Sequence, residues 1–244
     1  MITKKWSQLI KSLQIKKYRQ IHQSFLVEGA KSVQELLISN FKTDIIFATE
    51  RFYENNLKKI NCEYQIVSEN DLEKAGSLES NNSCIAIAKI KSNEFLKIEN
   101  NEFALILDEI KDPGNLGTII RIADWYGINK IICSEDTVDF YNPKVISASM
   151  GSFTRVKVYY CDLEDFLIKS KENIYGALLE GENIHKINFG SSGYILMGNE
   201  SKGIAENLKK YITKSINIPK FGNAESLNVA VATAVICDNL RREI

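Results

Sequence analysis

We expect the chain to be built around one segment, SINIPKFGNAESLNVAVATAVICDNLRR, residues 215–242. It begins with a short run typical of a β-strand, passes through a loop after Pro219 and ends in a long apolar helix. We expect this helix to begin near Ser226, because a serine side chain at a helix start accepts hydrogen bonds from free backbone N–H groups. Asn228 then needs another role, and polar side chains on both sides of Leu227 predict a buried polar site at the helix entrance.

The length and composition are those of a globular protein. The chain has 244 residues, of which 44% are hydrophobic and 25% charged, so it can form one large domain or two ordinary ones. The net charge of zero gives no indication of a nucleic-acid partner. Basic residues are nevertheless concentrated before residue 32, where they face Glu28 alone: Lys4, Lys5, Lys11, Lys16, Lys17, Arg19 and Lys31. Such a run is ordinarily a solvated face, and the alternative is a phosphate-binding arm.

The cysteines and the apolar runs bear on the cellular compartment. The five cysteines, at positions 62, 84, 133, 161 and 237, form no CxxC pair and have no histidine at ligand spacing. This pattern predicts reduced thiols, with neither a disulfide framework nor a bound metal. No apolar run approaches the ~20 residues that span a bilayer, and the first residues do not resemble a signal peptide. We therefore expect a soluble cytoplasmic protein without a membrane partner.

Short apolar runs alternate with helical patterns along the whole chain. A helical pattern over residues 4–21 precedes alternating strands and helices, which is typical of a compact α/β unit. A polar, charged stretch from Lys91 to Glu102 then indicates a boundary, so we place an N-terminal domain at residues 1–97 and a second domain at residues 98–244. The strands of the second domain are near-continuous apolar runs, which predict a mostly parallel sheet covered by helices on both faces.

The first of three polar loops is DEIKDPGNLGTIIR, residues 108–121. It follows a predicted strand and opens a predicted helix, where free N–H groups favour an anion or a polar ligand. We expect Asn115 to cap this helix. Arg121 lies two turns further on, and although a helical arginine is usually a surface residue, its position among three isoleucines favours a specific role. The loop has neither the GxGxxG nor the GxxxxGK[ST] fingerprint, which disfavours dinucleotide and P-loop sites.

The second loop is GNESKG, residues 198–203, and it also follows an apolar run. Its terminal glycines suit a tight turn with close backbone approach. On its own the pattern is consistent with an exposed turn in which Glu200 stabilises the start of the next helix. The third loop lies between Pro219 and Asn228. Ligands in open α/β sheets bind outside the carboxyl ends of strands, and because all three loops leave such ends, we expect them to share one site.

Together the three motifs resemble those of the SpoU-type (TrmH-like) RNA ribose 2′-O-methyltransferases of the SPOUT class. The residues that carry the resemblance are Asn115 with Arg121, Gly198-x-Glu200-x-x-Gly203, and Ile218-Pro219 followed by Glu225-Ser226-Leu227-Asn228. They occur in this order over residues 105–242, and FLVEG at residues 25–29 is similar to part of the family's substrate-binding domain. The chain departs from the family at Lys220, where relatives often carry an apolar residue, and this bears on RNA contacts more than on chemistry.

The resemblance implies an N-terminal α/β substrate-binding domain and a SPOUT catalytic domain whose C-terminal segment is threaded into a trefoil knot. Knots are rare among folds, so the resemblance alone predicts this one. It also implies that S-adenosylmethionine is held in the knot, largely through backbone groups at Gly198, Ile218 and Leu227, with Pro219 and Asn228 beside them. Family members are typically homodimers, so we expect a homodimer here.

By the same resemblance five side chains form the catalytic set: Arg121, Asn115, Glu200, Ser226 and Asn228. Arg121 lies nearest the chemistry. It either takes the 2′-hydroxyl proton or grips the adjacent phosphate and stabilises developing alkoxide charge. The strong basicity of a guanidinium, which keeps it protonated, weighs against the first role. The other four would orient Arg121, the ribose and the cofactor.

The implied function is S-adenosylmethionine-dependent 2′-O-ribose methylation of RNA. The extra N-terminal domain favours ribosomal RNA by family analogy, and transfer RNA is the alternative substrate. A non-catalytic RNA-binding protein of the same fold is disfavoured by the complete polar set, and an ordinary doubly wound nucleotide-binding enzyme by the missing glycine fingerprints. The two histidines, His22 and His185, lie outside the motifs, and we expect both to be surface residues.

Overall fold

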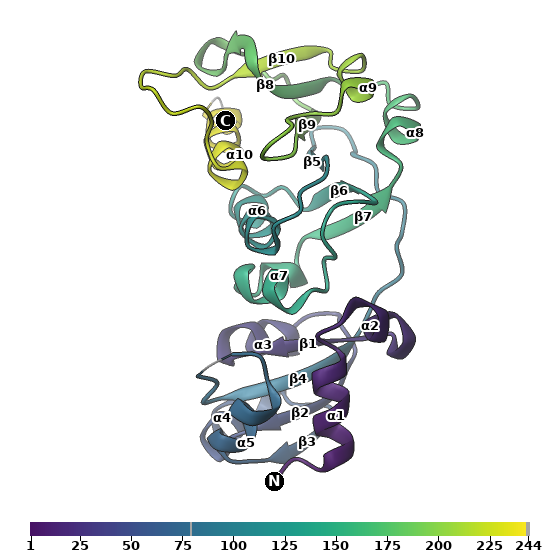
Figure 1. Cartoon of the computed structure of the whole chain (residues 1–244), viewed down its shortest axis with the longest axis vertical. Helices are drawn as coiled ribbons and strands as arrows, with labels where there is room; N and C mark the ends of the chain where they lie inside the picture. Colours follow the sequence, from purple (N-terminus) through teal and green to yellow (C-terminus); the bar gives the residue numbers. More distant parts are fainter. Residues whose placement is uncertain (79, 243–244) are drawn as a thin grey trace. The chain divides into compact units, whose positions relative to one another are not determined.

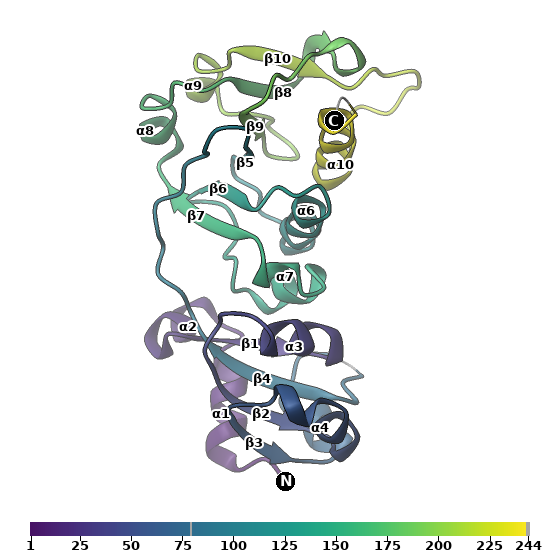
Figure 2. The ribbon, with the colours of Figure 1, turned by 180° about the vertical axis from the view of Figure 1, so that it is seen from behind.

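The computed structural model describes residues 1–78 and 80–242. The chain forms two compact units, each built on its own sheet (Figures 1 and 2). The first unit contains Met1–Ser92 and Asp139–Arg155, and the second contains Asn93–Val138 and the chain from Val156 onward. The segment Asp139–Arg155 therefore interrupts the second unit and folds with the first.

A four-stranded mixed sheet in the order β1-β4-β2-β3 forms the centre of the first unit. Strand β4 is antiparallel to both of its neighbours, whereas β2 and β3 are parallel. The strands are β1 (Ser24–Glu28), β2 (Thr43–Ala48), β3 (Glu63–Ile66) and β4 (Cys84–Lys89). The helices are α1 (Lys4–Ser12), α2 (Lys16–His22), α3 (Ala30–Leu37), α4 (Glu50–Asn56), α5 (Glu69–Ala75) and α7 (Pro143–Ala148), with short 3-10 turns at Leu57–Lys59 and Ser152–Thr154. One apolar core joins β1, β2 and β4 to α1 and α5.

The N-terminal basic pattern forms two helices, so the prediction of one helix over residues 4–21 is wrong. The break between α1 and α2 has a physical reason in the side chain of Arg19. Its guanidinium donates to the carbonyl oxygens of Leu13 and Gln14, both at 2.9 Å. The side chain thus satisfies backbone acceptors that lose their helical partners where α1 ends.

Arg19 is a buried cation and does not belong to an exposed basic face. Its side chain is 2% exposed, and its guanidinium pairs with the Asp139 carboxylate at 2.5 Å. Asp139 opens the segment that joins the first unit, and the same segment adds Tyr141 and Phe153 to an aromatic cluster around Phe25. This ion pair and these rings hold the inserted segment in the first unit.

We expect the substitution Asp139→Ala to lower the free energy of unfolding by about 3–5 kcal/mol, because it leaves the buried Arg19 guanidinium without a carboxylate. Chemical denaturation of the full chain measures the change. The matched control is Glu206→Ala, which removes a carboxylate from an exposed ion pair with Lys209 and should cost less than about 1 kcal/mol. Equal losses for the two variants would contradict the structural role of the Arg19–Asp139 pair.

The second unit contains a six-stranded sheet in the order β10-β8-β9-β5-β6-β7, and every neighbouring pair is parallel. This confirms the predicted α/β fold with a mostly parallel sheet. The strands are β5 (Phe103–Leu107), β6 (Lys130–Ser134), β7 (Lys157–Cys161), β8 (Ile174–Asn183), β9 (Gly193–Met197) and β10 (Lys214–Asn217). The helices are α6 (Pro113–Trp125), α8 (Leu163–Leu167), α9 (Glu206–Lys209) and α10 (Val229–Leu240), with a 3-10 turn at Ile184–Lys186. The central strands β5 and β9 are buried at every residue, as strands covered on both faces require.

The C-terminal helix α10 lies beside α6 (Figures 1 and 2). Its N-cap is Asn228, so the prediction that the helix begins near Ser226 is wrong. The side-chain oxygen of Asn228 satisfies the N–H groups of Ala230 and Val231, which leaves Ser226 in the exposed loop before the helix. The predicted buried site at the helix entrance is likewise wrong for this single chain, because residues 220–228 are all exposed.

The structure also bears on metals, membranes and thiols. No helix in the described part of the chain is long and apolar enough to cross a membrane. Residues 1–78 and 80–242 contain no group of three or more histidine, cysteine, aspartate or glutamate side chains placed to hold a metal ion. All five cysteines are free thiols, of which Cys84, Cys133 and Cys237 are buried.

Candidate functional site

Three polar loops leave the carboxyl ends of strands in the second unit. The first follows β5 and leads into α6, the second follows β9, and the third follows β10 and leads into α10. Strands β5 and β9 are neighbours, and β8 lies between β9 and β10. Because these strands are parallel, the three loops begin at the same edge of the sheet, where ligands bind in open α/β folds.

A chain of side-chain hydrogen bonds joins the three loops. The Nδ2 of Asn228 donates to the Oδ1 of Asn115 at 2.9 Å, and the Nδ2 of Asn115 donates to the Oε1 of Glu200 at 2.8 Å. We call these three residues the asparagine relay. Its members are 113 and 85 positions apart along the chain, so the fold alone brings them together.

Asn115 is free to join the relay because it does not cap α6. Asp112 is the N-cap, and its Oδ1 accepts from the Asn115 N–H at 2.7 Å. Pro113 occupies the first helical position, which suits proline because the N–H that it lacks would have no helical partner. The prediction that Asn115 caps the helix is therefore wrong, and its carboxamide bridges two other loops instead.

The relay has a fixed direction. The Oδ1 of Asn228 accepts from the N–H groups of Ala230 and Val231 at 3.0 and 3.3 Å, which leaves its Nδ2 as the group that faces Asn115. The oxygen of Asn115 accepts from that nitrogen, so its own nitrogen is the donor to Glu200. A carboxylate can only accept, and it therefore ends the chain. The second oxygen of Glu200, Oε2, has no hydrogen bond within the described residues and is open to a ligand.

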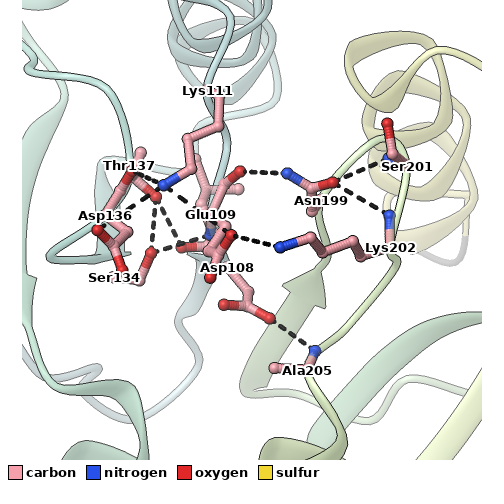
Figure 3. Close-up of polar contacts among 11 residues, drawn as sticks. Asp108, Glu109, Lys111, Ser134, Asp136, Thr137, Asn199, Ser201, Lys202 and Ala205 are labelled. Carbon is pink, nitrogen blue, oxygen red and sulfur yellow. Dashed lines mark hydrogen bonds and ion pairs between the residues drawn. The ribbon is translucent and has the colours of Figure 1, made fainter.

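The loop that carries Glu200 is a narrow hairpin. Asn199 and Gly203 exchange backbone hydrogen bonds of 3.0 and 2.9 Å, and the Asn199 side chain donates to the Glu109 carbonyl at 2.8 Å (Figure 3). A side chain at Gly198 would come within 2.2 Å of the Gly203 backbone, so this position requires glycine. The hairpin is thereby held against the loop that follows β5.

Asp108, the residue after β5, holds the same hairpin by a second bond. Its Oδ2 accepts from the Ala205 N–H at 2.8 Å (Figure 3). Burial raises the pKa of this carboxyl above its ordinary value, against the lowering effect of the Ala205 bond. The neighbouring Glu109 carboxylate lies 3.9 Å from the ammonium groups of both Lys111 and Lys202. A buried acid and a charged surface cluster thus support the base of the site.

Arg121 and Ser226 lie outside the relay. Arg121 is about 9 Å along the axis of α6 from Asn115 and about 120° around it. It is exposed, and within residues 1–78 and 80–242 its guanidinium has no hydrogen bond or ion pair. The Ser226 side chain is also exposed and without such a bond in the same residues. The structure therefore joins three of the five predicted catalytic side chains and leaves the cation and the hydroxyl open to a ligand.

The third loop offers backbone groups for a ligand. From Pro219 to Leu227, no backbone N–H or C=O group is hydrogen-bonded to another described residue. The Leu227 side chain is 50% exposed, and Ile218 and Pro219 are partly exposed. These groups, together with the backbone at Gly198, can hold a small polar ligand that also has an apolar ring, through main-chain hydrogen bonds and an apolar contact.

The sequence did not identify three supports of the site: Asp112, Asp108 and Asn199. Asp112 had a usable signal, because an aspartate directly before a proline is typical of a helix start. Asp108 and Asn199 had none, since their partners are 97 and 90 positions away. Their roles follow only from the pairing of β5 with β9.

The chain is similar to known proteins over most of its length. The model of the SpoU rRNA Methylase family matches residues 102–238, and that of the MRM3-like substrate binding domain matches residues 8–86. A relative from Bacillus subtilis (strain 168), the 23S rRNA (guanosine(2553)-2′-O)-methyltransferase RlmP, is 30% identical over 95% of this chain and 94% of its own length.

Solved structures of related proteins have the same fold over nearly the whole chain. A TrmH-family protein from Porphyromonas gingivalis has a TM-score of 0.89 at 30% identity and covers 100% of both chains. An AdoMet-bound rRNA methyltransferase from Sinorhizobium meliloti has a TM-score of 0.89 at 26% identity, over 100% of this chain and 97% of that one.

We expect Asp108→Asn to change stability in a pH-dependent way. Because the folded-state pKa of Asp108 is raised, the folded protein binds this proton more tightly than the unfolded chain. The protonated Asp108 carboxyl therefore contributes to the free energy of unfolding. This contribution is fully present below the ordinary pKa of 3.8 and is lost as the pH rises through the folded-state pKa. Asparagine cannot lose a proton and keeps an oxygen for the Ala205 N–H. The melting temperature of the variant, relative to wild type, should therefore rise with pH above about 4.

The control is Glu164→Gln, since a hydrogen bond from Lys210, followed by one from Asn207, lowers the pKa of Glu164. Its relative melting temperature should change little, and in the opposite direction with pH. A difference between Asp108→Asn and wild type that is constant or falls with pH would contradict the buried, destabilised carboxylate.

Proposed function

The chain belongs to the SpoU rRNA methylase family, and we propose that it transfers the methyl group of S-adenosylmethionine to a ribose 2′-hydroxyl of ribosomal RNA. The asparagine relay is the structural observation that supports this proposal most strongly. It joins the three motif loops at the edge of the sheet where ligands bind in open α/β folds. Ribosomal RNA is favoured over transfer RNA because the relative from Bacillus subtilis is named for 23S rRNA.

We assign cofactor binding to the backbone at Gly198, Ile218 and Leu227, with Pro219 and Asn228 beside them. When bound, S-adenosylmethionine supplies an electrophilic methyl group. The unpaired backbone groups of the third loop fit its polar ends, and the exposed Leu227 side chain fits an adenine ring. The trefoil knot expected from the family belongs to the same proposal, as a way of closing this loop around the cofactor.

The relay residues act by positioning. Transfer to a hydroxyl requires the oxygen within about 3–3.5 Å of the methyl carbon and in line with the bond that breaks. Glu200 is held through Asn115 by a residue that also caps α10, so its free Oε2 is a fixed acceptor for a ribose hydroxyl. Ser226, one residue before Leu227, would contribute an exposed hydroxyl to the same ribose or to the cofactor.

Arg121 supplies the positive charge. Its unpaired, exposed guanidinium can bind the phosphate next to the target ribose through two parallel hydrogen bonds and stabilise negative charge that develops on the 2′-oxygen. A guanidinium keeps its proton and is therefore a poor base, so the hydroxyl proton passes to water or to a phosphate oxygen. Arg121 is thus an electrostatic residue in this mechanism.

Two copies of the chain would associate through α6 and α10. This helix pair and the residue before the N-cap of α10 expose Trp125 by 83%, Val231 by 51% and Leu227 by 50%. Large exposed apolar side chains of this kind are enriched at protein interfaces. Arg121 is four residues before Trp125 and lies on the same exposed side of α6, so this homodimer would place it at the boundary between the copies.

Residues 1–97 would act as the RNA substrate-binding domain and residues 98–244 as the catalytic domain, in the cytoplasm. The match of a substrate-binding model to residues 8–86 supports the first role. A set of exposed lysines on α1 and α2 could contact RNA phosphates: Lys4, Lys5, Lys11, Lys16 and Lys17. RNA of this kind is usually recognised through loops and shape, which a lysine-bearing surface suits.

The test is transfer of labelled methyl from S-adenosylmethionine to total RNA from a strain that lacks this protein. We expect label in the ribosomal fraction, with resistance to alkaline cleavage at one nucleotide, because a 2′-O-methyl group blocks attack by the 2′-oxygen. Label in transfer RNA would correct the substrate. Cofactor binding without label in naked or particle-bound RNA would indicate a non-catalytic RNA-binding protein and overturn the proposal.

We expect Arg121→Ala to lower the rate of methyl transfer by at least about 100-fold, because one preorganised charge at the reacting centre is typically worth that much. His185→Ala should retain activity: His185 is exposed, and its Nδ1 lies 3.0 Å from the Asn239 side chain, outside the relay. Initial rates at saturating cofactor measure both. Equal rates for the two variants would contradict the role of Arg121.

A further inference from the structure

The second unit contains a hollow of about 770 Å³ that is separate from the relay. Its walls come from the connecting segment 95–100, Glu135 after β6, the end of β7, the helix α8 with the residues after it, and Tyr194 of β9. None of the three motif loops lines it. Just before the connecting segment, the Asn93 side chain exchanges two hydrogen bonds with the Tyr160 backbone of β7, at 2.8 and 2.9 Å.

Aromatic rings form one side of the hollow. Phe95 is 63% exposed, and its ring centroid lies 5.6 Å from that of Tyr159 and 6.2 Å from that of Phe166. Phe166 in turn contacts Tyr194 edge to face, with the centroids 5.5 Å apart. The hydroxyl of Tyr194 accepts from the Ile98 N–H at 3.3 Å, which fixes the connecting segment against this wall. The result is a preformed aromatic wall with one ring still accessible to a ligand.

Carboxylates outnumber ammonium groups around this wall. Five acids line the hollow, Glu99, Glu135, Asp162, Asp165 and Glu172, against three lysines, Lys97, Lys169 and Lys171. Asp162 caps α8 through its Oδ1. Within residues 1–78 and 80–242, the other four carboxylates have no hydrogen bond or ion pair from their side chains. The lining therefore carries a net negative charge, and four of its carboxylates are exposed and free to bind a cationic ligand.

The titration of two groups in the wall reflects this negative field. Burial raises the pKa of the Cys161 thiol to about 11, and the charges of Asp162, Glu135 and Asp165 add to the shift. Burial also raises the pKa of Tyr194, and the charge of Glu172 contributes in the same direction. The negative charge of these carboxylates thus reaches side chains that line the hollow.

We propose that this hollow is a docking site for an arginine-bearing segment of a partner protein. A guanidinium can stack on the exposed Phe95 ring and donate two hydrogen bonds to one carboxylate. It therefore matches both the aromatic side and the acidic side of the hollow. A lysine ammonium also carries a positive charge, but it lacks the planar face for stacking and the two parallel N–H donors for one carboxylate, so we expect it to bind less tightly. An RNA backbone would meet carboxylates along its phosphates, so the hollow is not an extension of the RNA surface. This inference does not rest on the methyltransferase activity.

The test uses the full chain and a synthetic peptide, acetyl-(Gly-Arg)4-amide, in isothermal titration calorimetry at low and moderate salt. We expect binding that weakens with salt, about 5-fold tighter than for the corresponding Gly-Lys peptide, and none for the Gly-Glu peptide. The double variant Asp165→Asn/Glu172→Gln should weaken binding at least about 10-fold, because two unpaired carboxylates lose their charge. Phe95→Ala should weaken it by about 3-fold or more.

Matched controls lie in the same unit. Glu180→Gln removes another exposed carboxylate, and Leu179→Ala removes an apolar side chain that is 76% exposed, so both should leave binding unchanged. If Phe95→Ala lowers the melting temperature, its weaker binding could reflect partial unfolding, and the conclusion then depends on the Asp165→Asn/Glu172→Gln variant. The inference is overturned if the wild-type chain does not bind the arginine peptide, if the double variant binds it equally well, or if single-stranded RNA competes for the site.

Discussion

The rest of the site depends on one chain of hydrogen bonds, from Asn228 through Asn115 to Glu200, at 2.9 and 2.8 Å. One carboxamide, that of Asn228, both caps α10 and starts this chain, so the position of the helix and the orientation of Glu200 cannot change independently. Each amide is oriented by its neighbour, and the carboxylate can only accept. A fixed carboxylate at this edge of the sheet is what the proposed positioning of a ribose hydroxyl requires.

The parallel sheet makes this chain possible. Because β5, β9 and β10 run in the same direction within one sheet, the loops after them leave one edge, and short polar side chains can then span the gaps. The base of the site is strengthened where Asp108 and Asn199 join the loops after β5 and β9 (Figure 3). Burying the Asp108 carboxyl opposes its ionisation, so this junction lowers stability at neutral pH in return for a fixed hairpin.

The sequence predicts where strands occur along the chain better than it predicts which distant residues are in contact. The apolar runs at residues 103–107 and 194–197 identify β5 and β9 almost to the residue, because strands buried on both faces have no polar positions to obscure them. Helix starts were less well predicted: Ser226 and Asn115 are both acceptable caps, and tertiary contacts selected Asn228 and Asp112 instead. The burial of Arg19 could not be predicted for the same reason, since its partner Asp139 is 120 positions away. The motifs were found through a family resemblance, whereas the hydrogen bonds that join them required the fold.

The most direct measurement is a double-mutant cycle on methyl transfer, with Asn115→Ala, Glu200→Ala and the double variant compared by kcat/KM. If the relay acts as one unit, the double variant should be no worse than the more damaging single variant, because either substitution alone already breaks the hydrogen-bonded link between α10 and the Glu200 carboxylate. Losses that multiply, with no coupling between the two positions, would contradict the account, since Asn115 and Glu200 would then act separately on the substrate.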